Sequence, residues 1–172
     1  LQISSSDQKI MLKKQIPFSR CLSPSEKPRT GIVGAQTHFQ HGLAKNPLAE
    51  NLELLRLSGA AWYRDEMCWG NAEKTKGKIE ILPEWDERID KSLQKGLMPL
   101  LELNSGNRFY DQGGIPYTDE GIAAFVKYCT TMADHFKGRI NHFEIWNEPN
   151  AMDSMFNPTS RPPEDYAKLI KA

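Results

Sequence analysis

The sequence predicts an α/β fold in which short strands alternate with helices on a parallel sheet. From Gly31 onward the chain repeats a strand-like and then a helix-like segment four times, an order typical of βαβ units. The helix-to-strand connections are short, as at Gly59 and Gly96, whereas the strand-to-helix connections are long, which indicates that the carboxyl ends of the strands carry the chemistry. Neither a GxGxxG motif nor a P-loop motif follows a strand, so a nucleotide-binding doubly wound sheet loses its main support.

The first two units each combine a strand-like run with a helical pattern. The run GIVGAQTHF (31–39) is short, β-branched and polar at its end, which predicts a strand. The helix that follows begins with Pro47 near its first position and is ended by Gly59. The run AAWYR (60–64) predicts the second strand, and after a polar loop a helix is expected over about 83–95.

The third and fourth units repeat this order. The run LMPLLEL (97–103) predicts the third strand, followed by a long polar loop. The next helix is the clearest in the chain, because its apolar residues recur at spacings of three and four between an N-cap at Thr118 and a stop at Gly138. The run INHFEIW (140–146) predicts the fourth strand, and a last helix begins at Pro162.

Composition and charge exclude several classes of protein. The 172 residues carry 22 basic and 22 acidic side chains, which argues against a dedicated nucleic-acid binder. The apolar runs are far shorter than the roughly 18 residues of a membrane-spanning helix, so no membrane partner is expected. The three cysteines show no metal-site spacing. Residues 1–30 are polar and rich in Ser, Lys and Pro, and are expected to form an extended lead-in to a domain over 31–172.

The segment HFEIWNEPN (142–150) carries the most functional information. It places the carboxylate of Glu148 at the end of a strand, directly after the amide of Asn147 and close to the indole of Trp146. Partial burial at such a position raises the pKa of a carboxyl toward that of a general acid, while the amide and the indole suit a sugar ring. The alternative is a surface-loop Glu after an ordinary strand. Glu144 lies an even number of residues before Glu148, on the same side of the predicted strand, and is expected to be structural. Pointing inward, it needs a cationic partner or a shared proton.

WNEPN at the end of a fourth strand resembles the acid/base motif of clan A glycoside hydrolases. The segment AAWYRDEMCWGNAEKTKGKIEI (60–81) is similar to the second-strand segment of families 5 and 39, and family 39 is the more similar of the two. The resemblance covers about residues 31–170. It implies a (β/α)8 TIM-barrel type of fold, of which only the first four β/α units are present as an amino-terminal half barrel.

The resemblance also implies roles for individual residues. Glu148 is expected to be the general acid/base, and Asn147 to bind the substrate's 2-hydroxyl. Arg64 is expected to orient the nucleophile and keep it ionised; the alternative is an ion pair at the surface or at the barrel mouth. That nucleophile would be a Glu on a seventh strand, outside the present chain. The implied activity is the retaining hydrolysis of a β-linked polysaccharide or oligosaccharide, with no cofactor and no metal.

Further residues near the predicted strand ends are candidates for sugar binding. His38 and His41 lie at and just after the first strand, and Asn104 ends the third; the alternative for each is a structural polar contact. A metal site at the two histidines lacks an evident third ligand. Trp69 and Tyr110 lie in predicted long loops and are candidate sugar-stacking platforms, with loop packing as the alternative.

Two other functions stay open from the sequence. One is a non-catalytic carbohydrate-binding or structural half barrel, which would bind saccharides or self-associate without hydrolysing them. The other is a metal-dependent barrel hydrolase that uses His38 and His41. An open half barrel would expose its strand edges and its inner face, so the isolated chain is expected to be insoluble, dimeric or inactive.

Overall fold

A computed structural model of the chain describes residues 2–4, 10–13, 31–41, 47–150 and 161–172. Within the predicted lead-in, β1 (Gln2–Ser4) pairs antiparallel with β2 (Ile10–Lys13). This two-stranded sheet was not predicted, because its strands are short and show no clear hydrophobic alternation.

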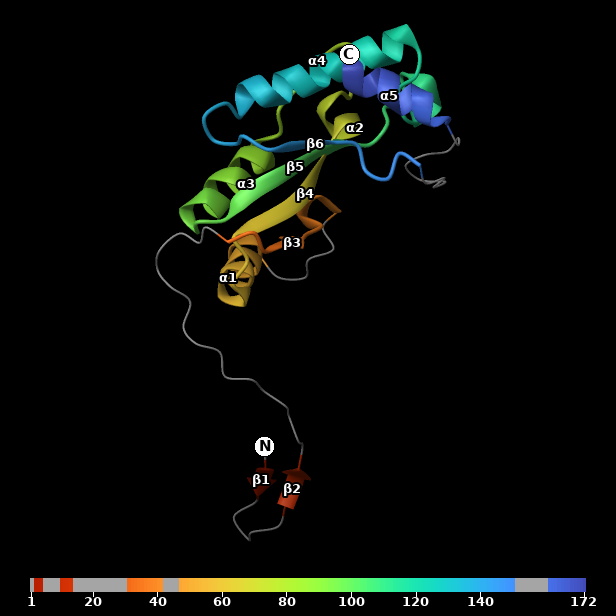
Figure 1. Ribbon diagram of the computed structural model, residues 1–172. Helices are drawn as coiled ribbons and strands as arrows, with labels where there is room; N and C mark the ends of the chain where they lie inside the picture. Colours follow the sequence, from red (N-terminus) through yellow and green to blue (C-terminus); the bar gives the residue numbers. More distant parts are fainter. Residues whose placement is uncertain (1, 5–9, 14–30, 42–46, 151–160) are drawn as a thin grey trace.

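Four parallel strands form the main sheet, in the order β3-β4-β5-β6 (Figure 1). They are β3 (Gly34–Gln36), β4 (Trp62–Cys68), β5 (Met98–Asn104) and β6 (Phe143–Ile145). Each neighbour in the sheet is also the next main-sheet strand along the chain, as in a barrel wall built from successive β/α units. The predicted α/β class and the parallel sheet are therefore confirmed.

Within the described ranges, four helices occupy the predicted places between and after these strands, and a fifth, α2 (Trp69–Ala72), lies where the sequence predicts a polar loop. Thr118 caps α4 by accepting a hydrogen bond from the N–H of Gly121 at 3.1 Å, and Gly59 ends α1 with a φ of 94°. The helices are α1 (Leu48–Ser58), α2 (Trp69–Ala72), α3 (Pro83–Gln94), α4 (Asp119–His135) and α5 (Pro163–Lys171), and the 3-10 turns are η1 (Phe39–His41) and η2 (Asp111–Gly113). No helix in the described part of the chain is long and apolar enough to cross a membrane.

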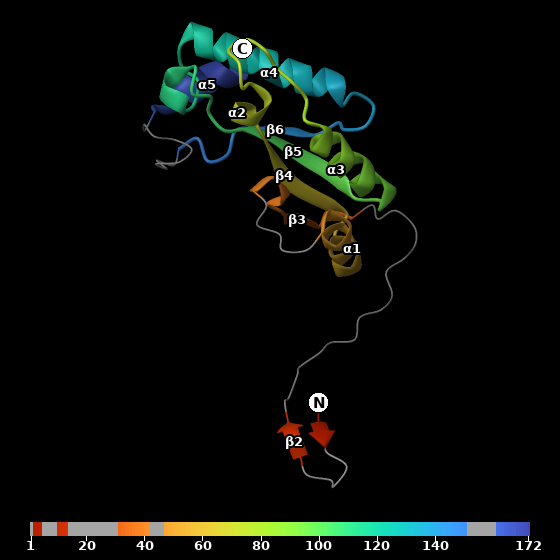
Figure 2. The ribbon, with the colours of Figure 1, turned by 180° about the vertical axis from the view of Figure 1, so that it is seen from behind.

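The main core lies between the sheet and the helices that pack on one of its faces. Figures 1 and 2 show α3 and α4 along this face from opposite sides. Alternate side chains of β4 and β5 point toward these helices, because successive residues of a strand face opposite ways. The buried members of this core include Met67, Leu101, Leu103, Trp85, Ile89, Phe125, Tyr128 and Met132.

The second strand extends beyond its predicted end. The sequence predicts residues 60–64, but β4 pairs with β5 as far as Cys68 opposite Asn104. Four paired positions, from Asp65 opposite Leu101 to Cys68 opposite Asn104, stabilise this extension, whereas the local sequence after Arg64 is typical of a polar loop. Arg64 consequently lies inside the strand rather than at its carboxyl end.

The face of the sheet opposite α3 and α4 is divided between polar and apolar side chains. At its amino-terminal end Ile32, Trp62, Arg64 and Leu100 line a cavity of about 580 Å³, and Ile32 is 98% exposed. This is the face that lies inside a closed barrel. Toward the carboxyl end the same face carries the charged residues of the candidate site.

Candidate active site

Arg64 is the centre of the polar network on the inner face. Its Nε donates to Glu144 Oε2 at 2.6 Å and its Nη2 to Glu144 Oε1 at 2.7 Å, a two-pronged pair. Nη2 also donates to Asn147 Oδ1 at 3.0 Å, and Nη1 donates to Gln36 Oε1 at 2.7 Å. The sequence left a cationic partner or a shared proton open for Glu144; the structure shows the cationic partner, which is Arg64.

Three glutamates on adjacent strands share one level of the sheet. Glu66 of β4 is in register with Glu102 of β5, which is in register with Glu144 of β6. Nη1 of Arg64 lies 2.7 Å from Glu102 Oε2, but the angle leaves both oxygens of this fully buried carboxyl without an aligned hydrogen-bond donor. Burial raises the pKa of Glu102 to about 7; Arg64 opposes this rise, and Glu66 and Glu144 add to it.

Sequence reasoning did not single out Glu102 or Glu66. A signal was present in strand parity, since Glu102 precedes Asn104 by two residues and must share its face. The register between neighbouring strands, which aligns the three carboxyls, depends on pairing that a single sequence does not reveal.

The segment after β6 is held from two sides. The backbone N–H of Asn147 donates to the side-chain Oδ1 of the buried Asn104 at 3.2 Å, while the side chain of Asn147 accepts from Arg64. Trp146 and Glu148, on either side of Asn147, have φ values of 66° and 45°, a left-handed conformation that costs a non-glycine residue about 1–2 kcal/mol. Such strain persists where the surroundings fix the backbone, often at functional sites. Glu148 is exposed at this carboxyl edge.

Of the two histidines of the first unit, His38 and His41, the structure describes the side chain of His38. The side chain of His38 is 52% exposed, and its Nδ1 lies 3.8 Å from Oε1 of Glu66. The structure thus places His38 beside the carboxylate cluster. The side chain of His41 lies outside the described residues. No group of three metal-ligating side chains occurs in the described ranges.

Three aromatic residues predicted to bind sugar lie in the core instead. Trp69 begins α2 rather than lying in a loop, and its side chain is 0% exposed. Its ring stacks on the ring of Tyr110, with 5.2 Å between the two centroids. Trp146 is also buried and packs edge-on against Phe125 at 5.7 Å. The structure therefore corrects the sequence prediction for Trp69, Tyr110 and Trp146, whose ring faces are covered by protein.

The buried carboxylate of Glu73 explains this aromatic packing. It accepts hydrogen bonds from Trp69 Nε1 at 2.6 Å, from Tyr110 Oη at 2.7 Å and from the N–H of Gly77 at 2.6 Å. These bonds satisfy the polar tips of both rings, as buried Trp and Tyr require. The spacing of four between Trp69 and Glu73 was the available sequence signal for this contact.

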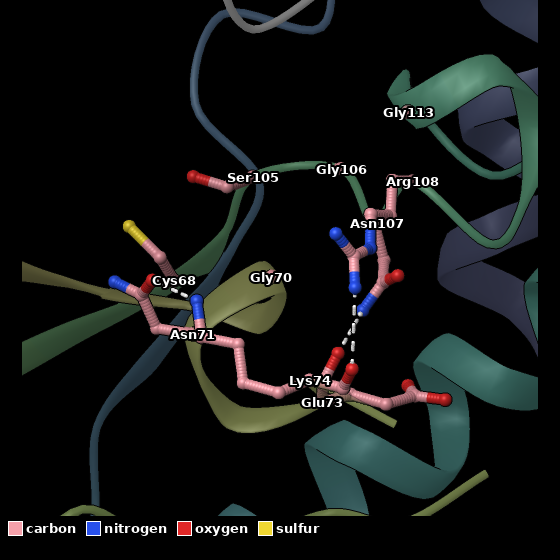
Figure 3. A pocket seen from close by; sticks show the side chains of 10 residues that line it. All are labelled: Cys68, Gly70, Asn71, Glu73, Lys74, Ser105, Gly106, Asn107, Arg108 and Gly113. Carbon is pink, nitrogen blue, oxygen red and sulfur yellow. Dashed lines mark hydrogen bonds between the residues drawn. The ribbon is translucent and has the colours of Figure 1, made fainter. Parts of the chain in front are cut away.

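A pocket of about 350 Å³ lies at the carboxyl ends of β4 and β5. Figure 3 shows the Lys74 side chain reaching to Asn71 Oδ1 at 2.9 Å. Asn107 anchors the opposite wall through the carbonyl of Glu73 at 3.1 Å. The loop turns tightly here, since a Cβ on Gly106 would meet a backbone oxygen of the same loop at 1.7 Å. The pocket is lined by Cys68, Gly70, Asn71, Glu73, Lys74, Ser105, Gly106, Asn107, Arg108 and Gly113.

A second ion pair lies on the helix-facing side of β4. Asp65 is fully buried and pairs with Arg88 of α3 at 3.0 Å. Burial raises the pKa of Asp65, while Arg88 lowers it. The pair faces away from the Arg64 network because Asp65 and Arg64 are consecutive residues of one strand; it joins the helix to the sheet.

No protein-family model and no curated protein sequence matches the chain. Solved structures do. A family 39 glycoside hydrolase from the gut symbiont Bacteroides cellulosilyticus WH2 superposes with a TM-score of 0.64 at 22% identity, over 80% of this chain and 27% of that chain. The exo-β-1,4-mannosidase Op5Man5 from Opitutaceae bacterium strain TAV5 matches with a TM-score of 0.59 at 16% identity, over 80% and 28%.

The endoglucanase Cel5A from Thermotoga maritima also matches, with a TM-score of 0.56 at 20% identity, over 80% of this chain and 45% of that chain. The chain thus spans less than half the length of these three enzymes. Four parallel β/α units are half of an eight-unit barrel. The described part of the chain therefore has an α/β fold that matches half of the TIM barrel of these glycoside hydrolases.

Proposed function

We propose that the chain carries the acid/base half of the active site of a retaining glycoside hydrolase that acts on β-linked polysaccharides or oligosaccharides. The observation that carries this proposal is the double anchoring of Asn147, by Asn104 through its backbone and by Arg64 through its side chain. This anchoring fixes the residue next to Glu148 at the carboxyl edge of the sheet, where barrel enzymes keep their catalytic groups.

Glu148 is the proposed general acid/base. In the first step its proton passes to the glycosidic oxygen as the bond to the anomeric carbon breaks. In the second step the resulting carboxylate takes a proton from the attacking water, which restores the acid. Its exposed position at the end of β6 leaves it accessible to a substrate.

Asn147 is the proposed partner of the 2-hydroxyl. Because its Oδ1 accepts from Arg64, the Nδ2 donor of the same amide points to the other side. A hydrogen bond from Nδ2 to the 2-hydroxyl strengthens as the sugar ring gains oxocarbenium character. Arg64 fixes the orientation of this amide and is thus a positioning residue in the proposal.

The proposed nucleophile is a second carboxylate outside these four units. A retaining mechanism requires it about 5–5.5 Å from the acid/base, and by resemblance it is a Glu on a seventh strand. The sequence expectation gave Arg64 the task of orienting it. The bonds of Arg64 to Glu144 and Asn147 favour a task on the acid/base side instead.

The remaining candidates are proposed to contact more distant parts of the substrate. The pocket beside Asn71 and Lys74 opens at the same carboxyl edge of the sheet, at the ends of β4 and β5, one to two strands from β6, which is about 5–10 Å at the usual strand spacing. His38, beside Glu66, lies at the end of the adjacent β3. The endoglucanase and exo-β-1,4-mannosidase names of two structural neighbours support the β-linked substrate class.

Hydrolysis by the full-length protein that carries this chain tests the proposal. We expect wild type to release reducing ends from β-linked glucan or mannan oligosaccharides, and Glu148→Gln to reduce kcat at least about 100-fold, the scale of general acid–base catalysis. Glu164→Gln, an exposed change of the same kind on α5, is the matched control. Saccharide binding without hydrolysis by wild type would instead identify a non-catalytic carbohydrate-binding half barrel.

A further inference from the structure

The guanidinium of Arg64 contacts side chains on two sides of it on the inner face. Its Nε and Nη2 edge binds Glu144 and reaches Asn147, while Nη1 lies 2.7 Å from both Gln36 Oε1 and Glu102 Oε2. The bond to Asn147 is the longest of these contacts, at 3.0 Å, and its acceptor is neutral. It is therefore the weakest, because bonds between two charged partners are shorter and stronger.

Glu102 sits between the other two carboxyls of its level, on the middle one of three neighbouring strands. Neighbouring strands are about 4.8 Å apart, and the carboxyls of Glu66 and Glu144 at that separation disfavour ionisation of the buried Glu102. Glu66 has its own contact with His38 at 3.8 Å, and Glu144 has the two-pronged contact with Arg64. The charged or titratable groups that act on Glu102 or lie on its level are Arg64, Glu66 and Cys68 of β4, Glu144 of β6, Tyr128 of α4, and Asp65 on the opposite face of β4.

We propose that Glu102 is a positioning residue for the acid/base segment, acting through Arg64. When Glu102 is neutral, Arg64 stays on Glu144 and Asn147. When Glu102 is ionised, the full charge on its oxygens draws the guanidinium toward β5, and the bond to Asn147 yields first. This inference rests on the proposed function of Asn147 and Glu148, and it makes their geometry depend on one buried proton.

The burial of Glu102 supports this proposal by placing the change near neutral pH. Desolvation is the largest cause of its raised pKa of about 7, and the single cation Arg64 does not offset it. Below that pH the buried carboxyl holds its proton, and above it the carboxyl competes for Arg64. The Asn147 side chain is therefore ordered on the acidic side of neutrality and released on the alkaline side.

The test compares wild type with Glu102→Gln, which keeps an oxygen for Nη1 but is neutral at every pH. The direct readout is the side-chain amide signal of Asn147 in 15N NMR spectra between pH 5 and 9. We expect this signal to titrate near pH 7 in wild type and to stay constant in Glu102→Gln. Asp65→Asn is the matched control, since it removes a buried carboxyl of the same sheet that pairs with Arg88; in this variant the titration should persist.

The second readout is the pH profile of kcat in the full-length protein. We expect the alkaline limb of wild type to move upward by at least about one pH unit in Glu102→Gln, and not in Asp65→Asn. An Asn147 signal that ignores pH in wild type, or titrates equally in Glu102→Gln, would overturn the proposal. Absence of hydrolysis in every variant would instead count against the proposed function, because the NMR titration does not depend on turnover.

Discussion

Arg64 on β4 and Glu144 on β6 form a two-pronged ion pair across the intervening strand β5, with N–O distances of 2.6 and 2.7 Å. Because successive residues of a strand face opposite sides of the sheet, the positions of Arg64 and Glu144 in their strands place both side chains on the inner face. The pair crosses from the second strand of the parallel sheet to the fourth. It therefore ties together the strand that carries the arginine and the strand that ends in the Asn147-Glu148 segment.

Replacing Arg64 by lysine is expected to destabilise this arrangement. A lysine ammonium lacks the planar array of N–H donors of a guanidinium, so it cannot bind both oxygens of Glu144 and the amide oxygen of Asn147 at once. We expect a loss of about 1.5–3 kcal/mol in the free energy of unfolding, the scale of hydrogen bonds to charged groups, measured by urea titration. Arg139→Lys changes a surface pair with Asp86 and should cost less than about 1 kcal/mol; equal costs for the two variants would contradict this reading of Arg64.

The stability of the protein should depend on pH through Glu102. Its pKa is raised from 4.5 to about 7 in the folded protein, so folding favours the protonated form. The resulting stability is fully present below pH 4.5 and is lost as pH rises through 7. The corresponding free energy is about 3 kcal/mol. Urea titrations of wild type and Glu102→Gln at several pH values should show this loss in wild type only, and parallel pH dependences would refute the assignment.

Trp69 should act on stability rather than on substrate affinity. The change Trp69→Phe keeps an aromatic ring but removes part of the buried indole and the bond from Nε1 to Glu73, and we expect it to cost at least about 1.5–3 kcal/mol. Trp62→Phe is the matched control, because Trp62 donates to a backbone oxygen at 3.1 Å in an exposed position, and it should cost less than about 1 kcal/mol. An unchanged unfolding free energy with a raised KM for oligosaccharides would restore Trp69 as a sugar platform.

Much of the fold is predictable from local patterns. The helix over Asp119–His135 follows from its apolar spacing and its Thr118 cap, and the parallel sheet follows from four alternating units. That Glu144 needs either a cationic partner or a shared proton also follows from the sequence, because a carboxylate on the inward side of a strand is costly to bury alone; the structure shows which of the two occurs. Each of these inferences uses only neighbouring residues or the cost of burying a charge.

The remainder depends on contacts between distant parts of the chain. Trp69 reads as a loop residue until β4 pairs with β5 as far as Cys68 and Asn104, which brings Trp69 into α2 and against Phe125 of α4 at 5.3 Å. The level shared by Glu66, Glu102 and Glu144 likewise exists only once the strands are in register. Tertiary pairing of this kind overrides the local preference for loop.

The role of Glu148 is tested most directly by chemical rescue. In a retaining enzyme that lacks its acid/base, azide attacks the glycosyl-enzyme without needing a general base. We predict that Glu148→Gln in the full-length protein turns over an aryl β-glycoside with a good leaving group slowly. We further predict that added azide accelerates it and gives a β-glycosyl azide, whereas wild type gives the free sugar. Wild-type rates in Glu148→Gln on both aryl and natural glycosides, with no effect of azide, would contradict the assignment.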